Sequence, residues 1–148
     1  MLVEDLMTRD VSTIHPDQTM ADAARVMRRL DVGVLPVAEH DRLVGMISDR
    51  DIALRGVGQE KPPQTPIREL MTPDVKYCFA DQDIEEVAGN MADIQLRRLP
   101  VLDRDKRLVG ILSLADIATS GEADEAGEAL TGISRPHAVT QAPQFPIL

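Results

Sequence analysis

Residues 45–51 read Gly-Met-Ile-Ser-Asp-Arg-Asp, and residues 110–116 read Gly-Ile-Leu-Ser-Leu-Ala-Asp. Each phrase holds a glycine, two apolar residues, a serine, two variable residues and an aspartate. Apolar residues that lead into a serine, with an acidic residue three positions later, are typical of a strand that ends at an N-capped helix. The chain therefore carries two copies of one strand-to-helix junction.

The sequence around these phrases is also duplicated. Leu6-Met7-Thr8 recurs as Leu70-Met71-Thr72, and Leu35-Pro36-Val37 recurs as Leu99-Pro100-Val101, both 64 positions later. Self-similarity at a fixed spacing is the signature of repeated structural units. We therefore divide the chain into repeat 1 (residues 1–56), a proline-rich linker (57–66), repeat 2 (67–120) and a C-terminal region (121–148) with a helix over 122–130 and an extended tail from 135.

Each repeat is predicted to follow the order β-α-β-β-α. In repeat 1 the apolar spacing predicts strands over residues 11–14, 34–37 and 43–48, and helices over 19–30 and 49–55. In repeat 2 it predicts strands over 75–79, 98–102 and 107–113, and helices over 83–94 and 114–118. A unit of about 50 residues buries too little apolar surface to be stable alone. We therefore expect an α/β (α+β) fold in which the two repeats pack about a pseudo-twofold axis.

Composition narrows the class of function. The formal net charge is −9, and no segment is basic, which argues against binding to a nucleic-acid backbone. No apolar run approaches the roughly 18 residues of a membrane-spanning helix, and the charged start of the chain is unlike a signal peptide. Cys78 is the single cysteine and is expected to be a buried thiol in a reducing cytoplasm. We predict a cytoplasmic protein that binds neither nucleic acid nor membrane.

The serine and the aspartate of each phrase allow two interpretations. In the first, they form a capping box that satisfies the free backbone amides at a helix start. In the second, the same helix start attracts an anion, the carboxylate accepts hydrogen bonds from both hydroxyls of a ribose, and the Arg50 guanidinium holds a phosphate as a bidentate fork. The second interpretation adds a nucleotide to the cap rather than replacing the cap.

Patterns for catalysis or metal binding are not found in the sequence. The three histidines, His15, His40 and His137, do not show the spacing of metal ligands. The sequence also holds no Gly-x-Ser-x-Gly motif and no Gly-x-x-x-x-Gly-Lys loop. We therefore predict no metal site and no enzyme activity.

The duplicated marks resemble the cystathionine β-synthase-type (CBS) family, in the tandem arrangement called a Bateman module. These marks are Leu-Met-Thr at the start of each copy, Leu-Pro-Val in each second strand, and Gly-h-h-Ser-x-x-Asp-Ile, where h is apolar, at 45–52 and 110–117. The resemblance covers residues 4–120. The stretches DVGVLPV (31–37) and SDRDIALRG (48–56) are similar to small bacterial two-CBS proteins of the hypoxic-response type.

The resemblance implies a function and a set of site residues. Such modules bind AMP, ADP, ATP and sometimes NAD or S-adenosylmethionine in clefts between the repeats, and they usually form dimers and regulate rather than catalyse. Asp51 and Asp116 are expected to hold the ribose, assisted by Ser48 and Ser113. The base is expected in apolar pockets formed by Thr13, Ile14, Leu35 and Pro36 in copy 1, and by Tyr77, Cys78, Leu99 and Pro100 in copy 2.

The two implied sites differ in their basic residues. Copy 1 has Arg50 where copy 2 has Ala115, and copy 2 has Arg97–Arg98 where copy 1 has Gly33–Val34. By the family's geometry we expect one better site, with the ribose on Asp51 and the phosphate on Arg50 and on Arg97 or Arg98. The alternative interpretation is that Arg97 and Arg98 simply lie on a solvent-exposed face of the strand.

The function predicted from these observations is a regulatory, energy-sensing module. It binds adenosine-containing nucleotides of the AMP, ADP and ATP class as regulatory ligands, requires no cofactor, and acts as a homodimer on a regulated protein that the sequence does not identify. The alternative is a protein–protein interaction or stress-response protein that keeps the CBS fold and binds no nucleotide.

Overall fold

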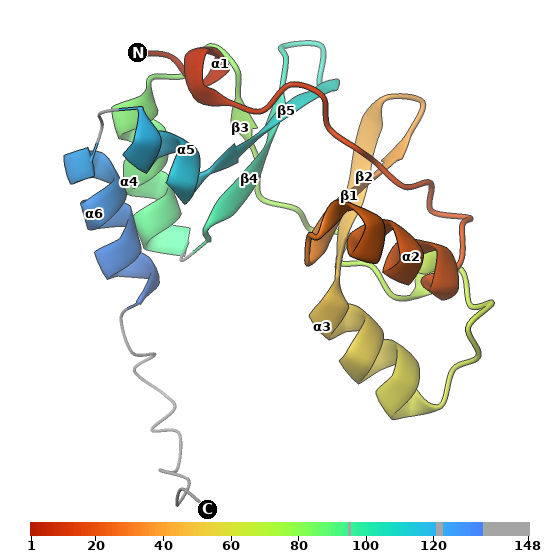
Figure 1. Cartoon of the computed structure of the whole chain (residues 1–148). Coiled ribbons are helices and arrows are strands. Elements are labelled where there is room, and N and C mark those ends of the chain that lie inside the picture. Colours follow the sequence, from red (N-terminus) through yellow and green to blue (C-terminus); the bar gives the residue numbers. More distant parts are fainter. Residues whose placement is uncertain (95, 121–122, 135–148) are drawn as a thin grey trace, which may run out of the picture.

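The computed structural model describes residues 1–94, 96–120 and 123–134, in which the two repeats lie side by side as two α+β units (Figure 1). Repeat 1 contains helix α2 (Met20–Leu30), the antiparallel strands β1 (Val34–Glu39) and β2 (Arg42–Ser48), and the short helix α3 (Asp49–Asp51). Helix α3 continues as a π-helical turn over Ile52–Gly56 and a 3-10 turn over Val57–Gln59.

Repeat 2 has the same order of helix, hairpin and helix, with a short strand added before its first long helix. Strand β3 (Cys78–Phe79) runs parallel to β4 (Arg98–Leu102), which pairs antiparallel with β5 (Leu108–Ser113). Helices α4 (Ile84–Ile94) and α5 (Leu114–Thr119) follow the same pattern as α2 and α3. The helix predicted over 122–130 is found as α6 (Ala123–Ile133), which packs on α4 and α5 (Figure 1). The tail predicted from residue 135 lies outside the described residues.

Local sequence signals explain where the helices begin. At α2, Thr19 Oγ1 accepts a hydrogen bond from the Asp22 amide at 3.1 Å, and Asp22 Oδ2 accepts one from the Thr19 amide at 3.0 Å. This reciprocal pair is the capping box that the sequence predicts. Helix α2 ends at Asp31, which adopts a left-handed conformation with φ of 54°. The predicted helix over 19–30 is thus confirmed.

The predicted first strand of each repeat is largely absent from the described part of the chain. In repeat 1 only Ile14 forms a bridge, parallel to Val37, and in repeat 2 the strand is limited to Cys78–Phe79. The reason is a tight turn in both copies, because the Val11 amide donates to the Arg9 carbonyl at 2.9 Å and the Val75 amide to the Pro73 carbonyl at 3.1 Å. These turns take the apolar residues out of a strand path.

The two repeats exchange their starting segments. Helix α1 (Val3–Leu6) lies beside repeat 2 in Figure 1, and Val3 and Met7 are buried in the core of repeat 2. Conversely, Ile67 and Leu70 are buried in the core of repeat 1. Each starting segment therefore completes the core of the other repeat, and the fold is confirmed as two repeats related by pseudo-twofold symmetry.

The exchange adds one residue to the hairpin edge of each repeat. Thr8 forms a reciprocal pair of backbone hydrogen bonds with Ile111, both 2.9 Å, and Thr72 forms the equivalent pair with Met46, at 2.8 and 3.0 Å. The linker is also fixed, because the amides of Met20 and Ala21 donate to the carbonyls of Thr65 and Pro63. The linker thereby caps the start of α2.

Candidate ligand-binding clefts

Two clefts of similar size lie between the repeats. Cleft A, of about 350 Å³, lies between a set of mainly apolar residues of repeat 1, called its wall, and the strand-to-helix junction of repeat 2. Cleft B, of about 390 Å³, joins the wall of repeat 2 to the junction of repeat 1. Cleft A is lined by Thr8, Asp10, Val11, Ser12, Leu30, Val32, Val34, Leu35, Pro36, Met46, Arg98, Ile111, Ser113 and Asp116. Cleft B is lined by Val34, Met46, Ser48, Asp51, Thr72, Asp74, Val75, Lys76, Leu96, Arg98 and Pro100.

The junctions hold their polar side chains by capping. Ser48 Oγ accepts a hydrogen bond from the Asp51 amide at 3.1 Å, and Asp51 Oδ2 accepts one from the Ser48 amide at 2.9 Å. Ser113 and Asp116 repeat this arrangement at 3.0 and 2.9 Å. The predicted capping box is confirmed at both junctions. It uses one oxygen of each carboxylate and fixes the side chain at the edge of its cleft.

The second carboxylate oxygens differ between the two junctions. Asp51 Oδ1 lies 3.2 Å from Nη2 of Arg55, one helical turn later. Arg55 also donates to the Leu70 carbonyl at 3.0 Å and lies 3.4 Å from Thr72 Oγ1, so it links the junction to the exchanged segment. The corresponding residue in repeat 2 is Ser120, which cannot form an ion pair. The sequence reasoning missed Arg55, although its i,i+4 spacing from Asp51 could have indicated the ion pair.

Several predicted site residues line the clefts. Their distribution follows the exchange, since each cleft takes its capped carboxylate from one repeat and most of its apolar wall from the other. Cleft A brings together Leu35, Pro36, Arg98, Ser113 and Asp116. Cleft B brings together Ser48, Asp51, Arg98 and Pro100.

Other predicted residues lie elsewhere. Ile14, Cys78 and Leu99 are 1%, 3% and 1% exposed and belong to the two cores, and none of the three is among the lining residues of cleft A or B. Burial raises the pKa of the Cys78 thiol to about 12. Thr13 lines a polar surface hollow with Arg9 and His15. Tyr77 lies near the hairpin loops, where its ring meets that of Phe79 edge to face at 5.5 Å.

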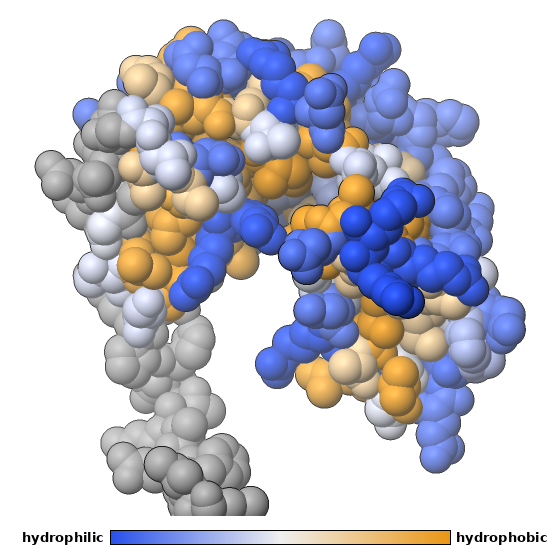
Figure 2. Space-filling view, in the orientation of Figure 1, coloured by the Kyte–Doolittle hydropathy of each residue, from blue (hydrophilic) through white to orange (hydrophobic). Residues whose placement is uncertain are grey.

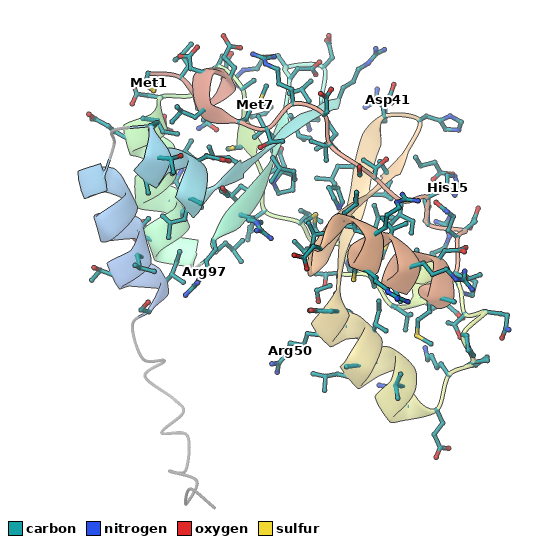
Figure 3. All side chains as sticks on the ribbon, viewed as in Figure 1. Met1, Met7, His15, Asp41, Arg50 and Arg97 are labelled. Carbon is teal, nitrogen blue, oxygen red and sulfur yellow. The ribbon has the colours of Figure 1, made fainter. Side chains whose placement is uncertain are left out.

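The predicted cluster of arginines around Asp51 is only partly formed. Arg98 lines cleft B together with Asp51, as expected. Arg97 instead lines an open groove of about 870 Å³ with Leu114 and Leu130 of repeat 2 and the C-terminal helix. Arg50 is exposed and does not appear in the lining of cleft A or B. Figure 3 shows Arg50 and Arg97 on the lower side of the molecule, which is hollowed between the repeats in Figure 2.

The sequence reasoning missed part of each wall. Val11 and Val75 enter the clefts because the tight turns direct the chain there, and Lys76 lies beside Val75 in cleft B. Asp10-Val11 recurs as Asp74-Val75, so the duplication itself could have indicated that these residues belong to the two sites.

Neither a metal cluster nor a membrane helix is found in the described part of the chain. No group of three or more His, Cys, Asp or Glu side chains there is arranged to hold a metal ion. None of the described helices is long and apolar enough to cross a membrane.

A model of the CBS domain family matches residues 3–57 and 67–121. The chain belongs to the CBS domain family and carries two CBS domains, which confirms the resemblance inferred from the repeated phrases. The CBS domain-containing protein YhcV of Bacillus subtilis (strain 168) is 43% identical over 133 residues, which cover 89% of this chain and 94% of that protein.

Solved structures of CBS-domain proteins share the fold. Hypoxic Response Protein I with two coordinated zinc ions is 37% identical, with a TM-score of 0.73 and coverage of 80% of this chain and 98% of that one. CBSX2 in complex with AMP is 26% identical, with a TM-score of 0.71 and coverage of 84% and 98%. The CBS domain pair of MJ0100, in complex with 5′-methylthioadenosine and S-adenosyl-L-methionine, is 30% identical, with the same TM-score and the same coverage.

Proposed function

We propose that this CBS-domain pair is a regulatory module that binds adenosine-containing nucleotides of the AMP, ADP and ATP class in clefts A and B. One observation carries the proposal: each cleft places a capped carboxylate from one repeat opposite an apolar wall from the other. An apolar wall suits a flat base, and a carboxylate oxygen suits the hydroxyls of a ribose. The AMP complex of CBSX2 and the adenosyl ligands of MJ0100 support this choice of ligand.

The size and charge of the clefts fit this class of ligand. Volumes of about 350 and 390 Å³ fall within the range of roughly 300–1,000 Å³ that is typical of small-molecule sites. Arg98 lines both clefts and supplies a guanidinium for a phosphate. In this proposal Ser48, Asp51, Ser113 and Asp116 contact the ribose, and Pro36 and Pro100 contact the base.

Regulation follows from the division of each site between the repeats. A ligand that contacts both repeats stabilises the arrangement in which wall and carboxylate face each other, and thereby shifts the population toward it. We propose that this shift alters contacts with a regulated protein, that the module works as a homodimer in the cytoplasm, and that it catalyses no reaction.

Thermal unfolding with and without ligand tests the proposal. The ligand-free protein is heated alone and with AMP, ADP, ATP, NAD or S-adenosylmethionine, beside Asp51→Asn and Asp116→Asn, which retain a cap acceptor. A ligand at about 100 times its Kd adds about 2.7 kcal/mol of stability, or several degrees in Tm. We expect such a shift with at least one adenine nucleotide and a smaller one in the variants. An unchanged Tm with all five ligands would refute the proposal.

A second candidate is an interaction protein that binds no nucleotide. The observation in its favour is the ion pair between Asp51 and Arg55, which already occupies the second oxygen of that carboxylate. The same experiment separates the two candidates, because a protein that binds no nucleotide would keep the same Tm whatever nucleotide is added.

A further inference from the structure

Two equivalent residues, Val34 and Arg98, lie between the clefts. They begin strands β1 and β4, and in the sheet register Val34 is opposite Ser48 and Arg98 is opposite Ser113. Both residues line cleft A, and both line cleft B. The position therefore belongs to both sites at once. The duplicated fold contains this position twice, but only Arg98 carries a charge there.

The charges of the two clefts are unequal. Cleft A contains the carboxylates of Asp10 and Asp116, and Arg98 is the single cation of its described lining. Cleft B contains Asp51 and Asp74 but has two cations, Arg98 and Lys76. Arg98 is exposed, and among the described residues no hydrogen bond or ion pair involves its side chain. Its guanidinium is free to turn toward either cleft.

We infer that Arg98 is a phosphate-binding cation shared by the two clefts, so that one bound phosphorylated nucleotide weakens the binding of a second. This inference rests on the proposed function. The Arg98 side chain carries a single positive charge, so a guanidinium that is paired bidentately with a phosphate in one cleft has little attraction left for a second phosphate in the other. Cleft B takes the first phosphate because Lys76 adds a second positive charge there.

Cleft A is then left with two carboxylates and no paired cation. A second phosphate entering it would lack a cationic partner and would meet like charge, and the chain as a whole carries a net charge of −9. Cleft A therefore suits an adenosine compound that is uncharged or cationic. The chain divides its two related clefts between two kinds of adenosine ligand.

Calorimetric titration of the ligand-free protein with AMP and, separately, with adenosine tests this inference. For AMP we expect two microscopic Kd values that differ by about tenfold or more, as loss of a charge-assisted hydrogen bond implies. Adenosine lacks the phosphate, so its two Kd values should lie close together. Equal Kd values for two AMP molecules would overturn the inference, and so would the same split for adenosine as for AMP.

Two variants place the same residue type at both equivalent positions, 34 and 98, either arginine or valine. Val34→Arg supplies a second guanidinium and should strengthen the weaker AMP site by about tenfold. Arg98→Val removes the shared cation and should weaken the stronger AMP site by about tenfold. In both variants the change in AMP binding should exceed the change in adenosine binding, because both substitutions alter the lining of the clefts but only the phosphate responds to the guanidinium. A weaker AMP site that stays unchanged in Val34→Arg, with Tm confirming its fold, would contradict the shared role.

The wild-type titrations need no variant to fold. Absence of binding by both AMP and adenosine would refute the proposed function itself, and this inference with it. Binding of both ligands at two equal sites would leave the proposed function standing and refute only the sharing of Arg98.

Discussion

The glycine that opens each repeated phrase has a steric role. A Cβ atom on Gly110 would lie 2.5 Å from the sulfur of Met7 and 2.9 Å from the Thr8 carbonyl oxygen. On Gly45 it would lie 2.7 Å from the sulfur of Met71 and 3.0 Å from the Thr72 carbonyl oxygen. Glycine at these positions therefore lets the exchanged segment of the other repeat lie directly against the hairpin.

Replacement of Gly110 should test this contact. We expect Gly110→Ala to destabilise the protein by about 1–3 kcal/mol, because the new methyl group collides with backbone that pairs with the same strand. Gly89→Ala is the matched control, since a Cβ atom there meets nothing within 4 Å and position 89 lies within helix α4. That control should be neutral or stabilising by up to about 1 kcal/mol. Urea unfolding that ranks the two variants in the opposite order would contradict the account.

Cys78 should be unreactive in the folded protein. Burial raises the pKa of its thiol to about 12, so almost no thiolate exists near neutral pH. A thiol-specific colorimetric reagent at pH 8 should label the native protein far more slowly than the protein in urea. Equally fast labelling in both conditions would place Cys78 outside the core.

At the scale of elements, the sequence predicts the helices and hairpins well and the first strands poorly. Helix α2 and both junctions are set by local capping boxes, which a short window of sequence reveals. The strand expected over 11–14 is reduced to a bridge at Ile14 because its backbone turns at Val11. An apolar run shows which residues avoid water, but not whether they pair with a sheet or line a cleft.

The capping box of α2 should make stability depend on pH. The backbone amide and the hydroxyl of Thr19 lower the pKa of Asp22 below its ordinary value of 3.8. A lowered folded pKa adds stability that is fully present above the unfolded pKa and lost as pH falls through the folded pKa. Wild type should therefore exceed Asp22→Asn in stability near neutral pH and lose this advantage below about pH 4. Urea unfolding measured between pH 7 and pH 3 checks this, and a difference that grows in acid would contradict it.

At the scale of the whole molecule, the exchange of starting segments decides how the repeats depend on each other. Local sequence cannot reveal this exchange, because Leu-Met-Thr looks the same whether it packs on its own repeat or on the other. The same limit explains why some residues proposed for the site lie away from both clefts. The repeat indicates Asp51, Asp116 and the two prolines as candidates, but it does not show which carboxylate faces which apolar wall. That pairing depends on contacts between residues far apart in sequence.

Core substitutions in the exchanged segments should act on the opposite repeat. Leu70 is fully buried in the core of repeat 1 although it lies in the starting segment of repeat 2. We expect Leu70→Ala to cost about 2–5 kcal/mol and to increase amide hydrogen exchange in α2 more than in α4. Met7→Ala should show the reverse pattern, since Met7 lies in the core of repeat 2. Faster hydrogen exchange confined to the repeat that contains each substituted residue would contradict this exchange of segments.

Nuclear magnetic resonance gives the sharpest test of whether adenosine nucleotides bind between the repeats. Amide spectra of the ligand-free, isotope-labelled protein are recorded as AMP is added. We expect saturable shifts of the amides of Ser48, Asp51 and Thr72 in cleft B, with His40 in the hairpin loop unchanged. Spectra that do not change at millimolar AMP, or shifts confined to residues outside both clefts, would contradict binding between the repeats.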